Sequence, residues 1–157
     1  MSAMVVTLSG GYELDDDRGR VDLDVVQTFL AHESYWARGR PRELVARSWA
    51  GSTRVVGCYL GDALVGGTRV ISDLATFAYL DDLFVLAAHR GRGLGVALVR
   101  ETIEHPDFAG VSWMLRTADA QSLYARFGFV ETPAGAMERP AGRSDGAPAI
   151  RDRLPRR

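Results

Sequence analysis

The sequence predicts a single mixed α/β domain, and three observations lead to this class. The chain has 157 residues, the usual size of one domain. Its apolar residues recur at helical spacing before Ala50 and in short, partly alternating runs after Thr53. A glycine-rich segment, Arg90 to Gly95, then separates an apolar run from another helical pattern. Strands and helices therefore alternate in an α/β or α+β arrangement.

The first third of the chain predicts a short strand and two helices. The strand is expected at Met4–Leu8 or at Tyr12–Leu14, before a polar turn. Asp22 can cap the first helix, whose apolar positions are Val25, Val26, Phe29 and Leu30. Pro41 suits the first turn of a second helix, Pro41–Trp49, because its missing N–H is not needed there.

The middle of the chain predicts a hairpin and a central strand. Arg54–Leu60 and Ala63–Ile71 flank a Gly61-Asp62 turn, which indicates a β-hairpin. Phe77–Leu86 is apolar in both of its alternating sets, as expected of a strand that is covered on both faces. A helix follows the glycine-rich segment and runs to about His105.

The C-terminal part predicts one more strand, a short helix and a tail. Val111–Arg116 reads as a strand, and Asp119 can cap a helix over Ala120–Phe127. Phe129-Val130 and a segment near Met137 are expected to form a closing pair of strands. Residues 140–157 are rich in Arg, Pro and Gly with few large apolar side chains, so we expect a disordered tail after a domain at 1–139.

Composition excludes several classes of protein. Cys58 is the only cysteine, so no internal disulfide forms, and no Cys/His cluster has the spacing of a metal site. No apolar run approaches the 20 or so residues that span a membrane, and the N-terminus lacks a signal-peptide pattern, which predicts a cytoplasmic protein. All 19 basic residues are Arg; residues 139–157 carry +4, which leaves −5 on residues 1–138 and argues against a nucleic-acid partner.

The glycine-rich segment predicts a phosphate-binding site. The first N–H groups of a helix have no partner within it, and the helix dipole places positive charge there. Gly91, Gly93 and Gly95 permit close approach, while Arg90 and Arg92 add charge. A solvated glycine-rich turn is the alternative. The spacing fits neither the dinucleotide-binding motif nor the P-loop, which requires a lysine.

Three segments resemble the GNAT family of N-acetyltransferases. Arg90-Gly91-Arg92-Gly93-Leu94-Gly95 matches the family's pyrophosphate loop, Arg/Gln-x-x-Gly-x-Gly/Ala. Leu83-Phe84-Val85 resembles its acyl-CoA strand, and Leu123 to Phe129 resembles its Leu-Tyr-x-x-x-Gly-Phe segment. The resemblance covers roughly Asp15 to Glu138, and Tyr35 to Pro41 is similar to a segment of small bacterial members. Ala87 departs from the proline of many relatives.

The resemblance implies a mixed, mostly antiparallel, splayed sheet flanked by helices, with acetyl-CoA as the cofactor. Backbone groups of the central strand would bind the pantetheine arm, and those of the loop would bind the pyrophosphate. The implied cofactor-binding residues are Leu83, Phe84, Val85, Arg90, Gly91, Arg92, Gly93, Leu94 and Gly95. Relatives are often dimers, so a homodimer is compatible with it.

Two residues are the candidate acid and base. Tyr124 matches the family's tyrosine that protonates the departing thiolate; a core tyrosine is the alternative. Asp81 and Asp82 interrupt an apolar strand, where burial would raise a carboxyl pKa toward that of a general base. Asp82 sits where relatives often carry an acidic or amide residue, whereas strand alternation places Asp81 with Leu83 and Val85, so Asp82 is the preferred base. Tyr79 occupies the position of the family's frequent glutamate, which leaves open a base that acts through water, or no dedicated base.

The acceptor is expected to be an amine of a small molecule or a peptide. Glu33, Trp36 and Arg38 lie at a helix exit and could bind it, although such residues more often fill a gap between helices. The predicted function is direct acetyl transfer from acetyl-CoA to a primary amine in a ternary complex. The alternative is an acyl-CoA-binding sensor without activity, and a weaker one is an RNA-associated protein that uses the Arg-rich tail.

Overall fold

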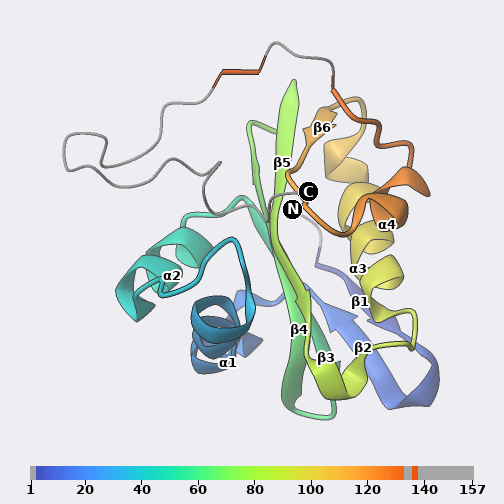
Figure 1. Ribbon diagram of the computed structural model, residues 1–157. Coiled ribbons are helices and arrows are strands. Elements are labelled where there is room, and N and C mark those ends of the chain that lie inside the picture. Colours follow the sequence, from blue (N-terminus) through green and yellow to red (C-terminus); the bar gives the residue numbers. More distant parts are fainter. Residues whose placement is uncertain (1–2, 133–135, 138–157) are drawn as a thin grey trace, which may run out of the picture.

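A computed structural model of the chain describes residues 3–132 and 136–137 (Figure 1). Six strands form one sheet in the order β1 to β6, antiparallel except for the β5–β6 pair. The strands are β1 (Val5–Thr7), β2 (Tyr12–Asp15), β3 (Arg54–Leu60), β4 (Ala63–Ser72), β5 (Phe77–Val85) and β6 (Ser112–Met114). The helices are α1 (Leu23–Thr28), α2 (Arg42–Ala50), α3 (Leu94–Ile103) and α4 (Gln121–Ala125). Figure 1 shows α1 and α2 on one face of the sheet and α3 and α4 on the other.

This architecture confirms the predicted mixed, mostly antiparallel sheet flanked by helices. The two segments that were candidates for the first strand both form strands, β1 and β2, and these pair as a hairpin. The predicted hairpin after Thr53 is β3–β4. The predicted tail, residues 140–157, lies outside the described residues.

The start and end of α1 follow from local chemistry. The Asp22 carboxylate caps α1 as predicted, accepting hydrogen bonds from the N–H groups of Asp24 (3.0 Å) and Val25 (3.2 Å). The helix then widens into a π-helical turn over Phe29–Glu33, where the Ser34 N–H bonds to the Phe29 carbonyl at 3.0 Å. Such wide turns are common at functional sites, and this one directs the following segment over the sheet.

Two predictions near the C-terminus are wrong. Asp119 does not cap α4, because the Thr117 hydroxyl accepts the hydrogen bond from the Ala120 N–H at 3.0 Å. Phe129 and Val130 are not in a strand, nor is Met137; residues 133–135 between them lie outside the described part. Phe129 instead packs on Tyr124 and the core beside α3.

Two apolar layers hold the helices to the sheet. The α1–α2 face buries Val26, Leu30, Val45, Trp49, Tyr59 and Phe84. The opposite face buries two groups along α3: Leu94 and Leu98 pack on Leu14 and Val56, and Val99 packs on Val70 and Leu80. Helix α3 is therefore packed on two sides, which fixes the glycine-rich loop at its start.

A β-bulge in β5 changes which residues face each layer. Gly67 pairs with Phe84, but the next pair is Arg69 with Asp81, so Asp82 is an extra residue. Asp82 has φ +50°, which is uncommon for a residue other than glycine. Before the bulge Ala78 and Leu80 face α3 and α4; after it Leu83 and Val85 do. The predicted uninterrupted alternation through Phe77–Leu86 is therefore wrong, because the bulge shifts it by one residue.

Strands β5 and β6 separate after a short contact. They pair only at Phe77–Tyr79 with Ser112–Met114. From Leu80 onward, β5 is paired with β4 on one edge and has no strand on its other edge among the described residues. The sheet is therefore open between β5 and β6, as the resemblance implied.

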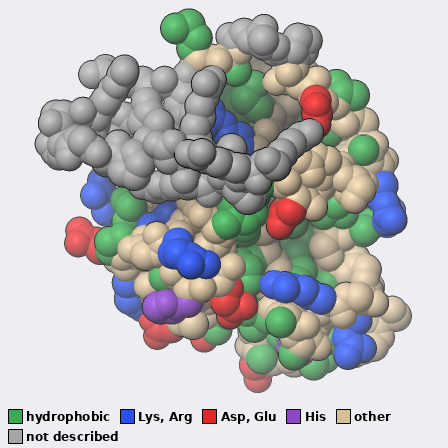
Figure 2. Space-filling view, viewed as in Figure 1, with side chains coloured by type: hydrophobic (Ala, Val, Ile, Leu, Met, Phe, Trp, Pro, Cys, Tyr) green, Lys and Arg blue, Asp and Glu red, His purple; other side chains and the backbone are tan. Residues whose placement is uncertain are grey.

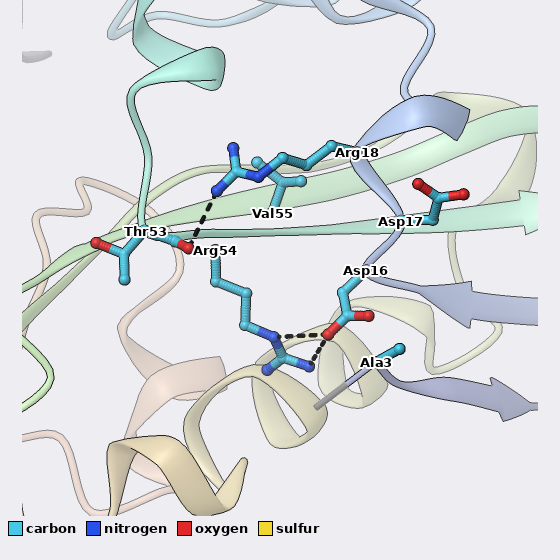
Figure 3. A pocket seen from close by; sticks show the side chains of 7 residues that line it. All are labelled: Ala3, Asp16, Asp17, Arg18, Thr53, Arg54 and Val55. Atoms are coloured by element: carbon cyan, nitrogen blue, oxygen red, sulfur yellow. Dashed lines mark hydrogen bonds and ion pairs between the residues drawn. The ribbon is translucent and has the colours of Figure 1, made fainter. Parts of the chain in front are cut away.

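Two arginines tie helices to the start of β3 and line a pocket there (Figure 3). Arg18 donates hydrogen bonds to the carbonyls of Trp49 and Thr53, both at 3.0 Å, and so closes the end of α2. Arg54 is 2% exposed and pairs with Asp16 at 3.1 Å. It also donates to the Glu101 carbonyl at 2.9 Å, at the end of α3. These contacts join β3 to the ends of α2 and α3.

The surface seen in Figure 2 carries acidic, basic and apolar side chains interspersed with one another. Among the described residues, none of the helices has the length and apolar character needed to cross a membrane.

Candidate functional site

The glycine-rich loop leaves the first turn of α3 accessible. Gly93 precedes α3 with φ +78°, and no side chain caps the helix. A Cβ atom added at Gly91 or Gly93 would meet no atom within 4 Å. The N–H groups of the first turn, which have no partner within a helix, therefore border open space. These residues fit an anion such as a diphosphate.

Contacts on both sides fix this loop. The Tyr12 hydroxyl and the His89 Nδ1 atom are 2.9 Å apart, which ties the loop to β2. Leu94 is 4% exposed and anchors the start of α3 in the core. The Arg90 Nε atom donates to the Val85 carbonyl at 2.9 Å, while Arg92 is exposed. The loop is held in place before any ligand binds.

The residues predicted to bind the pantetheine arm lie at the opening of the sheet. Leu83 and Val85 direct their side chains to the α3 layer, and Phe84 stacks on Phe29 in the other layer, with ring centroids 4.7 Å apart. Their backbone forms the edge of β5 that β6 leaves unpaired. The Val85 carbonyl already accepts one hydrogen bond from Arg90 and keeps a second lone pair.

Tyr124, the predicted acid, is on α4 beside the opening. It is 8% exposed and packs in the core beside α3. Its hydroxyl has no hydrogen-bond partner among the described residues. Burial, followed by the negative potential of Tyr35, Asp119 and Asp81, raises the pKa of Tyr124 well above its usual value. The phenol therefore stays protonated at neutral pH and can act as a donor.

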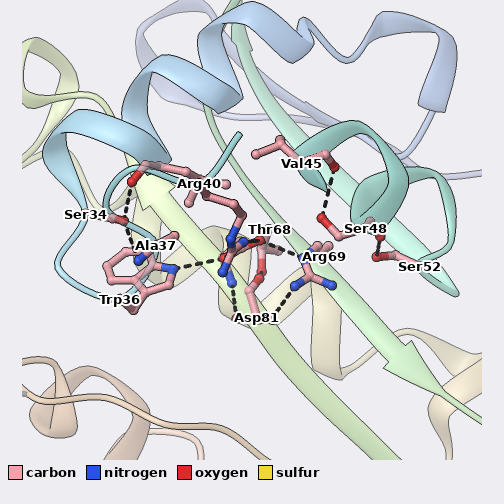
Figure 4. Close-up of polar contacts among 12 residues, drawn as sticks. Ser34, Trp36, Ala37, Arg40, Val45, Ser48, Ser52, Thr68, Arg69 and Asp81 are labelled. Carbon is pink, nitrogen blue, oxygen red and sulfur yellow. Dashed lines mark hydrogen bonds and ion pairs between the residues drawn. The ribbon is translucent and has the colours of Figure 1, made fainter. Parts of the chain in front are cut away.

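The two adjacent carboxylates at the bulge are bound by the same guanidinium (Figure 4). The Arg69 Nε atom donates to Asp82 at 2.7 Å, and its Nη2 atom pairs with Asp81. The expectation that Asp81 shares the face of Leu83 and Val85 is therefore wrong. The bulge turns both carboxylates toward the α1–α2 face of the sheet.

The environments of the two carboxylates differ. The Asp82 side chain is 0% exposed, and both of its oxygens accept hydrogen bonds. The Asp81 side chain is 25% exposed. Burial, and then the charge of Asp82, raises the pKa of Asp81 above its usual value, although Arg69 opposes the shift. Asp81 thus combines access to solvent with a raised pKa.

The segment between α1 and α2, residues 34–40, lies over the bulge; we call it the acceptor segment. Its Trp36 indole donates to Asp82 at 2.9 Å, and its Arg40 pairs with Asp82 at 2.9 Å (Figure 4). The Tyr35 hydroxyl accepts a hydrogen bond from the Ala118 N–H at 2.7 Å. The segment therefore bridges the bulge of β5 and the loop that precedes α4.

The three predicted acceptor residues are placed differently. Trp36 is half-buried and committed to Asp82, whereas Glu33 and Arg38 are exposed. Neither Glu33 nor Arg38 forms an ion pair with another described residue. Their role in binding an acceptor stays a prediction.

Sequence reasoning missed two residues of this site, Arg40 and Arg69. Arg69 lies in the apolar strand β4, and a charge in such a strand indicates a buried partner. That signal was available from the sequence. No such signal exists for Arg40, because its partner Asp82 is 42 residues away and their contact depends on the bulge.

Comparisons with known proteins agree with this geometry. The family profile of the acetyltransferase (GNAT) domain matches residues 50–131. A proposed GNAT-family acetyltransferase from Xanthomonas campestris is 39% identical, with 83% of this chain and 93% of that chain covered and a TM-score of 0.79. A search of the curated proteins found no match.

More distant solved structures share the fold. A probable acetyltransferase from Staphylococcus aureus is 22% identical, with 82% of this chain and 98% of that chain covered and a TM-score of 0.68. Glucosamine-6-phosphate N-acetyltransferase from Arabidopsis thaliana is 11% identical, with 82% and 97% covered and a TM-score of 0.57.

Proposed function

Because the chain belongs to the GNAT family of acetyltransferases, we propose that it transfers an acetyl group from acetyl-CoA directly to a primary amine in a ternary complex. The amine belongs to a small molecule or to a protein. One observation carries the choice of donor: the unpaired edge of β5 leads to the uncapped first turn of α3. An extended amide chain that ends in a diphosphate matches both features.

The residues that would hold acetyl-CoA follow from this match. Backbone groups of Leu83 and Val85 would bind the two amides of the pantetheine arm as an added strand. N–H groups from Gly91 to Gly95 would bind the pyrophosphate, and Arg92 would add charge. Bound there, acetyl-CoA supplies a thioester carbonyl that an amine can attack. The C–N bond forms as the C–S bond breaks, so nitrogen loses one proton and sulfur gains one.

Tyr124 is the proposed donor of the proton to sulfur. Its raised pKa keeps the phenol protonated at neutral pH, and its hydroxyl is not committed to another described residue. Its place on α4 beside the opening supports this role. The proton returns to the phenolate from solvent after the thiol leaves.

We assign the proton acceptor to Asp81 in preference to Asp82. Asp82 is enclosed by three donors and has no contact with solvent, whereas Asp81 keeps a quarter of its side chain exposed. A carboxylate whose pKa is raised by burial removes a proton from an ammonium more readily than an ordinary one. Asp81 can act on the amine directly or through one water.

A thiol-release assay tests the function. The protein is incubated with acetyl-CoA and a panel of alkylamines, arylamines, amino acids, amino sugars and lysine-containing peptides. We expect amine-dependent release of coenzyme A with at least one class, and a mass increase of one acetyl group on the amine. Tight binding of acetyl-CoA in calorimetry without turnover of any amine would contradict the transferase and favour a sensor.

A further inference from the structure

Asp82 is the most heavily bonded side chain of the site, and its three partners come from two parts of the chain, the acceptor segment and β4. It accepts from the Trp36 indole at 2.9 Å, from Arg40 at 3.1 and 2.9 Å, and from Arg69 at 2.7 Å. Its side chain is 0% exposed. Its backbone has φ +50°, a conformation that costs an L-residue energy unless its surroundings fix it.

The partners of Asp82 connect the bulge to the acceptor segment. The π-helical turn after α1 holds both ends of this segment: the Ser34 hydroxyl donates to the Leu30 carbonyl at 2.6 Å, and the Gly39 N–H donates to the Ala31 carbonyl at 2.9 Å. The contacts from Trp36 and Arg40 to Asp82 are what fix the segment to the sheet. Without them the segment would keep the Tyr35–Ala118 hydrogen bond and the core packing of Ala37, but it would lose its polar contacts with β5.

We propose that Asp82 is a positioning residue that fixes the acceptor segment over the bulge of β5 and, through Arg69, orients Asp81. The proposal rests on the proposed function, because the segment is inferred to bind the acceptor. Asp82 then governs the affinity for the amine without exchanging a proton with it. The two neighbouring aspartates have separate tasks, one structural and one chemical.

The charges around the bulge make Asp81 a matched control for Asp82. Asp82 is the only ion-pair partner of Arg40 among the described residues, whereas Arg69 pairs with both aspartates. Asp82→Asn therefore releases Arg40 and weakens the bond to Trp36. Asp81→Asn makes a change of the same size one residue away and leaves both contacts intact.

Kinetics with the best amine of the panel test the proposal. We expect Asp82→Asn to raise the KM for that amine about tenfold, the size of one lost charge-assisted hydrogen bond, with little change in the KM for acetyl-CoA. The fall in activity at low pH, which protonation of the base causes, should persist in Asp82→Asn and should disappear in Asp81→Asn. Loss of that fall in Asp82→Asn with an unchanged amine KM would identify Asp82 as the base and overturn the proposal.

A second measurement does not depend on turnover. The chain has three tryptophans, so the indole N–H signal of Trp36 can be assigned in an NMR spectrum by its loss in Trp36→Phe. We expect that signal to shift and to exchange faster with solvent in Asp82→Asn, and to stay unchanged in Asp81→Asn. An unchanged signal in Asp82→Asn would overturn the proposal even if no amine is acetylated. Failure of the transferase alone leaves this result intact.

A milder variant covers the case in which Asp82→Asn does not fold. Arg40→Lys keeps a positive charge but loses the planar pairing geometry of arginine, while Arg40→Gln loses the charge as well. We expect the amine KM to rise in the order wild type, Arg40→Lys, Arg40→Gln. Equal values for the three proteins would contradict the positioning role.

Discussion

Burial, more than direct charge pairing, sets the pKa values of the two side chains proposed for proton transfer at the opening of the sheet. Burial is the largest cause of the raised pKa of both Tyr124 and Asp81. The shift makes the Asp81 carboxylate a stronger base and keeps the Tyr124 phenol protonated at neutral pH. Both directions are compatible with the roles proposed for the two residues.

Removal of the Tyr124 hydroxyl tests the acid. We expect Tyr124→Phe to lower kcat by at least about a hundredfold and to leave the affinity for coenzyme A unchanged, because the ring still packs. Steady-state kinetics and calorimetry provide the two values. Tyr59→Phe is the control, since the Tyr59 hydroxyl is buried without a partner and burial raises its pKa to about 12. Equal loss in both variants would exclude a specific role for Tyr124.

The raised pKa of Asp81 predicts the sign of a pH effect on stability. The folded protein binds the Asp81 proton more tightly than the unfolded chain, so stability is lost as pH rises from near 3.8 through the folded pKa. Asp81→Asn should therefore gain Tm relative to wild type as pH rises above about 4.

Asp73→Asn should show the opposite sign. Hydrogen bonds from Thr76, Ala75 and Phe77 lower the pKa of Asp73, so its contribution is present at neutral pH and lost as pH falls. Thermal melts of the two variants across the same pH range make the comparison. A common sign would contradict the shift at Asp81.

At the scale of single elements, the loop and helix α3 form the proposed diphosphate site, and the backbone at its start favours glycine. Gly93 adopts φ +78° beside open space, so a methyl group there would strain the backbone and enter the space proposed for the anion. One added methyl group would therefore reduce both stability and coenzyme A binding. A second glycine with a similar φ, outside the loop, separates the two effects.

Gly93→Ala is expected to reduce stability by about 1 kcal/mol and to weaken coenzyme A binding at least about tenfold. Gly61→Ala, in the β3–β4 turn, has φ +61° and equally open space, so it should lose similar stability and keep full binding. Chemical denaturation and calorimetry give the two quantities. Equal binding by the two variants would place the diphosphate elsewhere.

Elements were more predictable from the sequence than their contacts. The glycine-rich loop, the β3–β4 hairpin and the cap at Asp22 depend on neighbours in the chain and form as predicted. The bulge at Asp82 depends on the register between β4 and β5, which alternation alone does not encode. The Trp36–Asp82 bond joins residues 46 positions apart. The choice of Asp81 over Asp82 as the proposed base depends on the bulge and on this bond, so it could not be made from the sequence.

Across the whole molecule, stability depends on buried charge as well as on the two apolar layers. Arg54 connects β3 to the end of α3 and has Asp16 as its ion-pair partner. Burial lowers the pKa of Arg54, which means that its charge is held at a cost that Asp16 offsets.

Loss of that partner should be severe. Asp16→Ala is expected to lower the free energy of unfolding by about 3–5 kcal/mol, because it leaves a buried charge without compensation. Asp24→Ala removes an exposed pair with Arg42 and should cost at most about 1 kcal/mol. Urea denaturation of both variants measures the difference. Similar losses would show that Arg54 finds other compensation.

The brief pairing of β5 with β6 would also make the folded state sensitive to the proposed acyl donor. A molecule that lies along the free edge supplies main-chain partners that a seventh strand would otherwise provide, and it binds only the native form. At a concentration one hundred times its dissociation constant, such a ligand stabilises the fold by about 2.7 kcal/mol. The persistence of this protein against heat and proteases should then follow the supply of its own acyl donor.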